Sequence, residues 1–139
     1  MSKPVALVTG AGGEMGHLLL PALRSRGYDV VALDLVPIPP DLASSCKEAV
    51  ALSILDTRAI EDLFERHHPA IVPHLAAVWY MKAEKDPDLA QDVNTNGTIS
   101  LFRLARREAL AAARNVVMMF PSSIAVYGLP DARAKEAAG

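Results

Sequence analysis

The chain has 139 residues, of which 51% are hydrophobic and 22% are charged, and its formal net charge is −2. This length suits one globular domain, and the small net charge gives no attraction to nucleic acid or to an anionic membrane. The longest apolar run, residues 75–81, is far shorter than the ~20 residues that cross a bilayer. Together with a single cysteine and no signal-peptide pattern after Met1, these features predict a cytoplasmic protein with no nucleic-acid or membrane partner.

Short aliphatic runs alternate along the chain with longer segments of helical periodicity. In chain order, the predicted elements are a strand over 5–9, a helix over 14–26, strands over 29–33 and 49–54, a helix over 57–67, a strand over 70–75, a helical stretch over 86–114 and a strand over 116–120. The proline-rich residues 37–40 are expected to be a loop. This alternation predicts an α/β fold, with one Rossmann-type domain over residues 1–139 and a doubly wound parallel sheet of about five strands in the order 3-2-1-4-5.

Single residues predict further details of the helices. Asp56 is expected to cap the helix over 57–67, because a carboxylate accepts the unpaired amides of a first helical turn. Asn94 and Gly97 are weak helix formers and predict a break near 94–97. The expected buried side of the long helical stretch consists of Ile99, Phe102, Leu104, Ala105, Ala109 and Ala112.

A glycine-rich turn follows the first predicted strand and opens the first predicted helix. Gly10, Gly13 and Gly16 have the spacing G-x-x-G-x-x-G. Without Cβ atoms, the backbone can turn tightly, approach a pyrophosphate and pack a helix close to a strand. The positive end of that helix attracts phosphate. A turn that merely links strand to helix has the same composition, so the motif needs a second feature beside it.

That second feature is Asp34, eighteen residues after Gly16 at the end of the second predicted strand. A carboxylate at this position can accept hydrogen bonds from an adenosine ribose and would repel a 2′-phosphate. Neither Leu35 nor Val36 supplies the arginine that NADP favours. The pattern therefore predicts dinucleotide binding, with NAD as the cofactor.

Several segments in order complete a recognisable pattern: TGAGGEMG at 9–16, Asp34, HLAA at 74–77, DVNTNGT at 92–98 and PSSIAVYG at 121–128. The chain resembles the N-terminal part of the extended short-chain dehydrogenase/reductases, also called NAD-dependent epimerase/dehydratases. Within that family the likeness is greatest to the short-chain type of L-threonine 3-dehydrogenase, through residues 83–98 and 120–128. The resemblance implies hydride transfer from a secondary alcohol to NAD.

The resemblance also implies roles for individual positions. The cofactor would contact Gly10, Gly13, Glu14, Met15, Gly16, Asp34, Ser53, Ile54, Leu75, Ala76 and Ala77. Ser123 and Asn94 match the family's catalytic positions, and Ser122 and Tyr80 would lie beside the substrate. Ser53 stands where many relatives carry an aspartate that holds the adenine amine, and Tyr80 stands where threonine dehydrogenases tend to have a small hydroxyl residue.

The family's acid/base pair, Tyr-x-x-x-Lys, does not occur in this sequence. Tyr28, Tyr80 and Tyr127 are followed four places later by Ala32, Glu84 and Asp131. We therefore expect a chain that lacks the C-terminal substrate-binding part, is inactive alone and takes a small-molecule substrate only when completed. The alternatives are a fragment of a nucleotide-sugar epimerase/dehydratase and a non-catalytic dinucleotide-binding module.

Two further expectations concern partners and metals. A sheet without the family's later elements has an uncovered edge and face, which favours a homo-oligomer. His67, His68 and His74 have no cysteine or carboxylate cluster at ligand spacing, so no metal site is predicted.

Overall fold

The computed structural model describes residues 2–123, 126, 128, 133 and 136. Their sheet has five parallel strands in the order β3-β2-β1-β4-β5, as predicted. The strands are β1 (Val5–Thr9), β2 (Asp29–Asp34), β3 (Glu48–Ala51), β4 (Ile71–Pro73) and β5 (Val117–Met119). The helices are α1 (Glu14–Ser25), α2 (Pro40–Ala43), α3 (Thr57–His67), α4 (Tyr80–Lys85), α5 (Pro87–Gln91), the π-helix η1 (Asp92–Gly97) and α6 (Thr98–Ala111).

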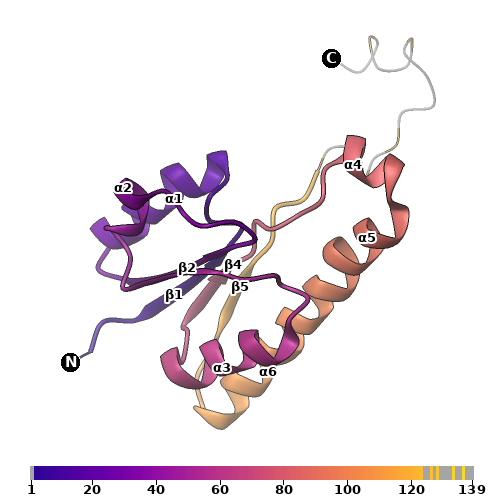
Figure 1. Cartoon of the computed structure of the whole chain (residues 1–139). Coiled ribbons are helices and arrows are strands. Elements are labelled where there is room, and N and C mark those ends of the chain that lie inside the picture. Colours follow the sequence, from indigo (N-terminus) through magenta and orange to yellow (C-terminus); the bar gives the residue numbers. More distant parts are fainter. Residues whose placement is uncertain (1, 124–125, 127, 129–132, 134–135, 137–139) are drawn as a thin grey trace.

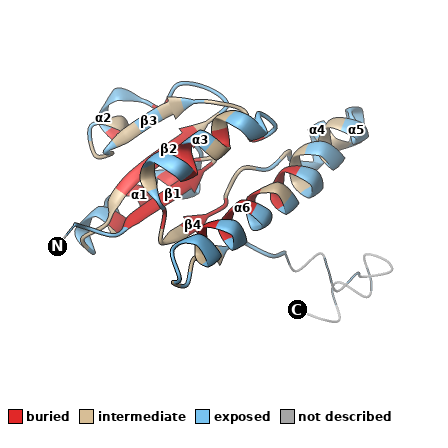
Figure 2. Cartoon of the chain, turned by 90° about the horizontal axis from the view of Figure 1, so that it is seen from below, coloured by how far each residue is buried: buried red, intermediate tan, exposed pale blue. Residues whose placement is uncertain are grey.

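Helices cover the sheet from both sides, with α1 and α2 on one face and α3 and α6 on the other (Figure 1). Successive side chains of a strand point to opposite faces. In β1, Ala6 and Val8 therefore join the core beneath α1, while Leu7 packs with Phe64 of α3 and Leu101 of α6. Figure 2 shows this burial concentrated on the central strands. Two buried faces explain why β1 and β2 are continuous aliphatic runs in the sequence.

The structure shortens or shifts several predicted strands. β3 ends at Ala51 and not at residue 54, because after Leu52 the chain turns at Ser53. This turn is closed by a hydrogen bond from the Asp56 N–H to the Ser53 carbonyl at 3.0 Å and by one from the Leu55 N–H to the Ser53 hydroxyl at 3.2 Å. The predicted strand over 70–75 is reduced to β4, although an isolated bridge from His74 to Thr9 continues its direction.

The predicted loop over 37–40 ends one residue early, because α2 begins at Pro40. Proline suits the first position of a helix, where no intrahelical N–H donor is needed. The prediction that Asp56 caps α3 is confirmed, since its Oδ1 accepts the Ala59 N–H at 3.1 Å. Within the described residues, no helix is long and apolar enough to cross a membrane.

The long helical stretch is α5, η1 and α6 in succession. The expected break near 94–97 is wrong in kind: the chain remains helical there and widens into a π-helix. The expected buried side is also partly wrong, because Ile99 and Phe102 are 43% and 47% exposed. The buried stripe of α6 consists of Thr98, Leu101, Leu104, Ala105 and Glu108. Two of its members are polar, which is why an apolar pattern does not locate it.

Candidate nucleotide-binding site

The candidate site lies at the carboxyl ends of the strands, where β1 stands between β2 and β4. The chain leaves β1 through α1 on one face and reaches β4 through α3 on the other, so the winding reverses here. Parallel sheets bind ligands at such a switch point. A cleft of about 430 Å³ opens at this place. The predicted residues that line it are Gly10, Gly13, Asp34, Ser53, Ile54, Leu75, Ala76 and Ala77.

The glycine turn at the end of β1 is tight for specific steric reasons. Gly10 has a φ of +66°, and a Cβ there would lie 2.5 Å from the Ala76 backbone nitrogen. A Cβ on Gly16 would lie 1.9 Å from the Ala11 carbonyl oxygen, so α1 packs directly on the turn. Gly13 is less crowded. Its N–H donates to the Gly10 carbonyl at 3.2 Å, and a Cβ on Gly13 would lie 3.4 Å from that same oxygen.

The first turn of α1 presents amide donors at this turn. The first intrahelical bond runs from the His17 N–H to the Gly13 carbonyl, and no side chain caps the helix. The N–H groups of Glu14, Met15 and Gly16 therefore precede the helix's own hydrogen-bond ladder. Such amides, together with the positive end of the helix dipole, can hold phosphate oxygens.

Asp34, at the end of β2, is hydrogen-bonded to the glycine turn. Its Oδ2 accepts the Gly12 N–H at 2.9 Å, and its Oδ1 lies 3.4 Å from the Val36 amide nitrogen. A carboxylate has about four lone-pair sites. Asp34 therefore keeps acceptor capacity for ribose hydroxyls while it fixes the turn. Gly12 lies inside the glycine motif, but the sequence alone did not predict its hydrogen bond to Asp34.

The opposite end of the cleft is apolar. Leu52, Ile54, Leu89 and Val93 line it. Gly97 of η1 packs closely on Ile54, because a Cβ there would lie 2.7 Å from the Ile54 Cδ1. Ser53, which the family resemblance implies beside the adenine, lines the same cleft. This end of the cleft can accept a flat base through contact with aliphatic side chains.

Asn94 acts on the wall of the cleft through the backbone of Val78. The Asn94 Oδ1 accepts the Val78 N–H at 2.7 Å, and the Asn94 Nδ2 donates to the Val78 carbonyl at 2.9 Å. Val78 and Trp79 both line the cleft. The predicted catalytic asparagine therefore holds the segment after β4 in place, and its side chain is not among the cleft-lining groups.

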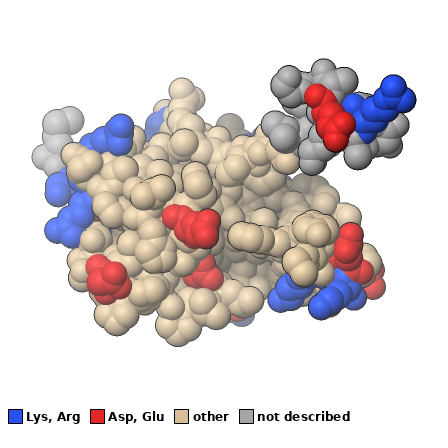
Figure 3. Space-filling view, turned by 90° about the horizontal axis from the view of Figure 1, so that it is seen from above, with Lys and Arg blue, Asp and Glu red and all other residues tan. Residues whose placement is uncertain are grey.

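Three other predicted site residues, Ser122, Ser123 and Tyr80, are not among the residues that line the cleft. Ser122 and Ser123 are exposed and follow β5, and Tyr80 is exposed at the start of α4. Tyr127 lies outside the described residues. Sequence reasoning missed Trp79 and Lys82 in the cleft wall, because α4 was not predicted. Lys82 brings a positive charge to the α4 side of the cleft. On the face seen in Figure 3, uncharged residues make up most of the surface, and the charged side chains lie in small groups among them.

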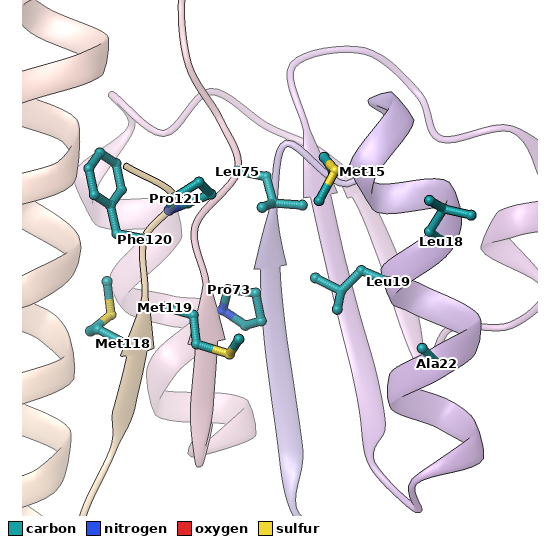
Figure 4. Close-up of a pocket in the computed structure, with 10 residues that line it drawn as sticks. All are labelled: Met15, Leu18, Leu19, Ala22, Pro73, Leu75, Met118, Met119, Phe120 and Pro121. Atoms are coloured by element: carbon teal, nitrogen blue, oxygen red, sulfur yellow. The ribbon is translucent and has the colours of Figure 1, made fainter. Parts of the chain in front are cut away.

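Met15 lines a second groove and not the nucleotide cleft. In Figure 4, Met15, Leu18, Leu19 and Ala22 of α1 lie across from Pro73, Leu75, Met119 and Pro121. The groove has a volume of about 620 Å³, and every residue that lines it is apolar. With no titratable or polar side chain in it, this groove offers no chemistry. It is an uncovered part of the sheet face that α1 shares.

The histidines have protein partners in the structure. His67 Nε2 lies 2.5 Å from a Glu48 oxygen, and His68 Nδ1 lies 3.3 Å from a Glu108 oxygen. His74 is buried between two threonines. The part of the chain that the structure describes contains no group of three side chains placed to hold a metal ion.

A glycine turn, an acidic residue ending the second strand and a cleft at the switch point define a Rossmann-type dinucleotide-binding domain. Residues 6–138 match the NAD dependent epimerase/dehydratase family, and the chain belongs to that family. The fold class and the family resemblance predicted from the sequence are thereby confirmed.

Individual relatives carry two different activities in their names. UDP-glucose 4-epimerase of Rhizobium meliloti is 30% identical over 132 residues, which are 90% of this chain and 37% of that protein. A monomeric L-threonine 3-dehydrogenase from a metagenome has 33% identity and a TM-score of 0.74, with 88% of this chain and 37% of that one covered. UDP-glucose 4-epimerase of Brucella ovis in complex with NAD has 30% identity and a TM-score of 0.76, with 92% and 38% covered. The chain thus spans somewhat over a third of the length of these relatives.

Proposed function

We propose that this chain is the NAD-binding portion of an oxidoreductase that resembles L-threonine 3-dehydrogenase. The observation that carries the proposal is the hydrogen bond from Gly12 to Asp34 at the mouth of the cleft. It links the turn suited to phosphate directly to the carboxylate suited to ribose. The NAD-dependent family and an NAD-bound relative with the same fold support the choice of cofactor.

The residues present fit the adenosine and pyrophosphate parts of NAD. The amides after Gly13 would hold the pyrophosphate, with Lys82 contributing positive charge from the other wall. Asp34 would accept the hydroxyls of the adenosine ribose and reject a 2′-phosphate by charge repulsion. Ser53 and Ile54 would border the adenine. Ala76 and Ala77 leave room for the nucleotide to cross the end of β4, because their side chains are single methyl groups.

Bound NAD would supply a hydride acceptor for a secondary alcohol. The protein residues would have to orient that alcohol and take its proton, and Ser123 is the described candidate for the hydrogen bond to the reacting oxygen. An unperturbed tyrosine has a pKa near 10 and is a poor base at neutral pH without a neighbouring cation. Since the sequence has no Tyr-x-x-x-Lys, we infer that this chain binds NAD without significant turnover.

The likeness to UDP-glucose 4-epimerases supports a second candidate, an NAD-dependent nucleotide-sugar epimerase/dehydratase portion. In that case the same cleft would hold NAD and the missing substrate contacts would select a nucleotide sugar. The bulky Tyr80, where threonine dehydrogenases tend to have a small hydroxyl residue, argues against threonine as the substrate. A non-catalytic dinucleotide-binding module is the third possibility and predicts NAD binding alone.

Trp79 provides the experiment, because it is the only tryptophan of the chain and it lines the cleft. Titration with NAD should change its fluorescence in a saturable manner, and the same titration with inorganic pyrophosphate should give a much weaker response. The liganded chain is then supplied with L-threonine and, separately, with UDP-glucose. No saturable NAD signal would reject the proposal, and rapid NADH formation from threonine would reject the inferred lack of turnover.

A further inference from the structure

Three buried polar side chains form a continuous hydrogen-bonded chain beneath the cleft. Thr9 ends β1, His74 follows β4 and Thr98 begins α6, and their exposed fractions are 0%, 1% and 9%. The Thr9 Oγ1 lies 2.6 Å from the His74 Nδ1, and the His74 Nε2 lies 2.8 Å from the Thr98 Oγ1. The function proposed above assigns no role to these three side chains.

The partners of the two threonines determine the direction of each hydrogen bond. The Thr98 hydroxyl donates to the Asn94 carbonyl at 2.8 Å, so its oxygen must accept from His74. The His74 Nε2 therefore carries the proton, and the His74 Nδ1 accepts from the Thr9 hydroxyl. The Thr9 oxygen in turn accepts the Ala76 N–H at 3.3 Å. Every N–H and O–H donor in this series of hydrogen bonds has an acceptor, and the imidazole at its centre is neutral.

The chain of bonds joins the two walls of the nucleotide cleft. At one end, Thr9 directly precedes Gly10, and its carbonyl accepts the Leu75 N–H at 3.0 Å. At the other end, Thr98 holds the backbone of Asn94, whose side chain holds Val78. The glycine turn and the segment after β4 are thus linked through one imidazole ring.

Aromatic stacking fixes the plane of that ring. The ring of Phe120 lies 5.6 Å from that of His74, centroid to centroid, with 28° between the planes. Phe120 directly precedes the segment that carries Ser122 and Ser123. The imidazole, which directly follows β4, therefore contacts the last residue of β1, the first residue of α6 and the residue after β5.

We propose that His74, as its neutral Nε2–H tautomer, is a positioning residue that sets the separation between the glycine turn and the Asn94–Val78 wall of the nucleotide cleft. The proposal rests on the function proposed above only for its effect on NAD, because the geometry itself involves no ligand. An apolar side chain of similar volume would fill the same space but could not specify the distance to two hydroxyls. The donor-to-acceptor direction of the hydrogen bonds at His74 is therefore the property to test.

The test compares Thr98→Val, which removes the hydroxyl and keeps the branched shape, with Thr98→Ser, which keeps the hydroxyl. Long-range proton–nitrogen correlation spectra report the tautomer of His74 in the wild-type chain. We expect the Nε2–H form in the wild type and in Thr98→Ser. In Thr98→Val, the tautomer should change or become mixed, and the side-chain amide resonance of Asn94 should shift. The Kd for NAD should rise roughly tenfold in Thr98→Val, because the Asn94–Val78 wall of the cleft loses its fixed position.

Each result decides the matter. An Nδ1–H tautomer in the wild type overturns the proposal without any variant, so a failure of Thr98→Val to fold does not protect it. Unchanged Asn94 resonances and an unchanged Kd in folded Thr98→Val also overturn it. If the wild type binds no NAD, the proposed function fails, whereas the tautomer and the Asn94 resonances still test the positioning role.

Discussion

Asp34 and Gly12 are separated by 22 residues in the chain, yet the Asp34 Oδ2 accepts the Gly12 N–H at 2.9 Å. This bond makes the acidic residue at the end of β2 part of the glycine turn after β1. A ribose-binding carboxylate is usually considered for what it does to the ligand. We propose this ribose role for Asp34, whose carboxylate also organises the backbone that would receive the phosphates. Its removal should therefore weaken the contacts with both the ribose and the phosphates.

The first prediction concerns cofactor choice. Asp34→Asn keeps a side-chain oxygen for the Gly12 N–H and removes the negative charge. We expect NAD binding to weaken severalfold and NADP binding to improve, because charge repulsion of the 2′-phosphate is lost. Asp41→Asn, on α2, is the matched control. Competition titrations give both Kd values, and an unchanged preference for NAD over NADP in Asp34→Asn would show that the carboxylate does not select the cofactor.

The second prediction separates two glycines of one motif. A methyl group on Gly13 has only ordinary contact with the Gly10 oxygen, whereas a methyl group on Gly16 clashes with the Ala11 carbonyl. Gly13→Ala should keep its melting temperature and lose NAD affinity at least roughly tenfold, because the methyl group occupies the approach of the pyrophosphate. Gly16→Ala should unfold at a clearly lower temperature. Equal effects of the two variants on stability would contradict this assignment.

The third prediction follows from the burial of His74, which lowers its pKa to about 4. The unfolded chain binds a proton at this residue near pH 6.5, so between pH 6.5 and 4 the unfolded state holds more protons than the folded state. The free energy of unfolding should therefore fall by about 2 kcal/mol from this residue as the pH drops from 7 to 5. Urea denaturation of the wild type and of His74→Gln measures the difference.

His17→Gln, which replaces an exposed histidine on α1, is the control for that comparison. The comparison shows whether the change in slope is specific to the buried histidine. A His74→Gln variant with the same slope as the wild type would mean that His74 carries its proton in the folded chain.

The fourth prediction concerns self-association. The apolar groove beside α1 is open to solvent, and β5 is an edge strand whose Val117, Met119 and neighbouring Phe120 are about half exposed. Such surfaces favour association, so we propose that the chain forms homo-oligomers through this face. Leu18→Glu, in the groove, should shift sedimentation toward the monomer. Leu110→Glu, equally apolar and exposed but on α6, should not, and a monomeric wild type at tens of micromolar would refute the proposal.

The central part of this fold could be predicted from local sequence, because its causes are local. β1 and β2 are aliphatic runs buried on both faces, Gly27 with a φ of +85° follows the end of α1, and Asp56 caps α3. Most residues of the candidate cleft could be predicted for the same reason, since the glycine turn directly follows β1 and Asp34 is the last residue of β2. These elements carry their signals within a few residues.

What could not be predicted depends on contacts between distant segments. The π-helix η1 has Asn94 bonded to Val78, and neither residue indicates this partner in the sequence. The buried stripe of α6 includes Glu108, which pairs with Arg114, and Thr98, which pairs with His74. These partners allow Glu108 and Thr98 to be buried although they are polar. A search for apolar residues cannot find them, and it selected the exposed Ile99 and Phe102. α4 was missed because residues 75–81 form one apolar run across its start.

The most direct test of the account is calorimetric titration of the 139-residue chain with NAD at neutral pH. We predict saturable binding of one NAD per chain, with NADP binding more weakly under the same conditions. Heat no greater than that of dilution at millimolar NAD would contradict the claim that this chain is a nucleotide-binding unit.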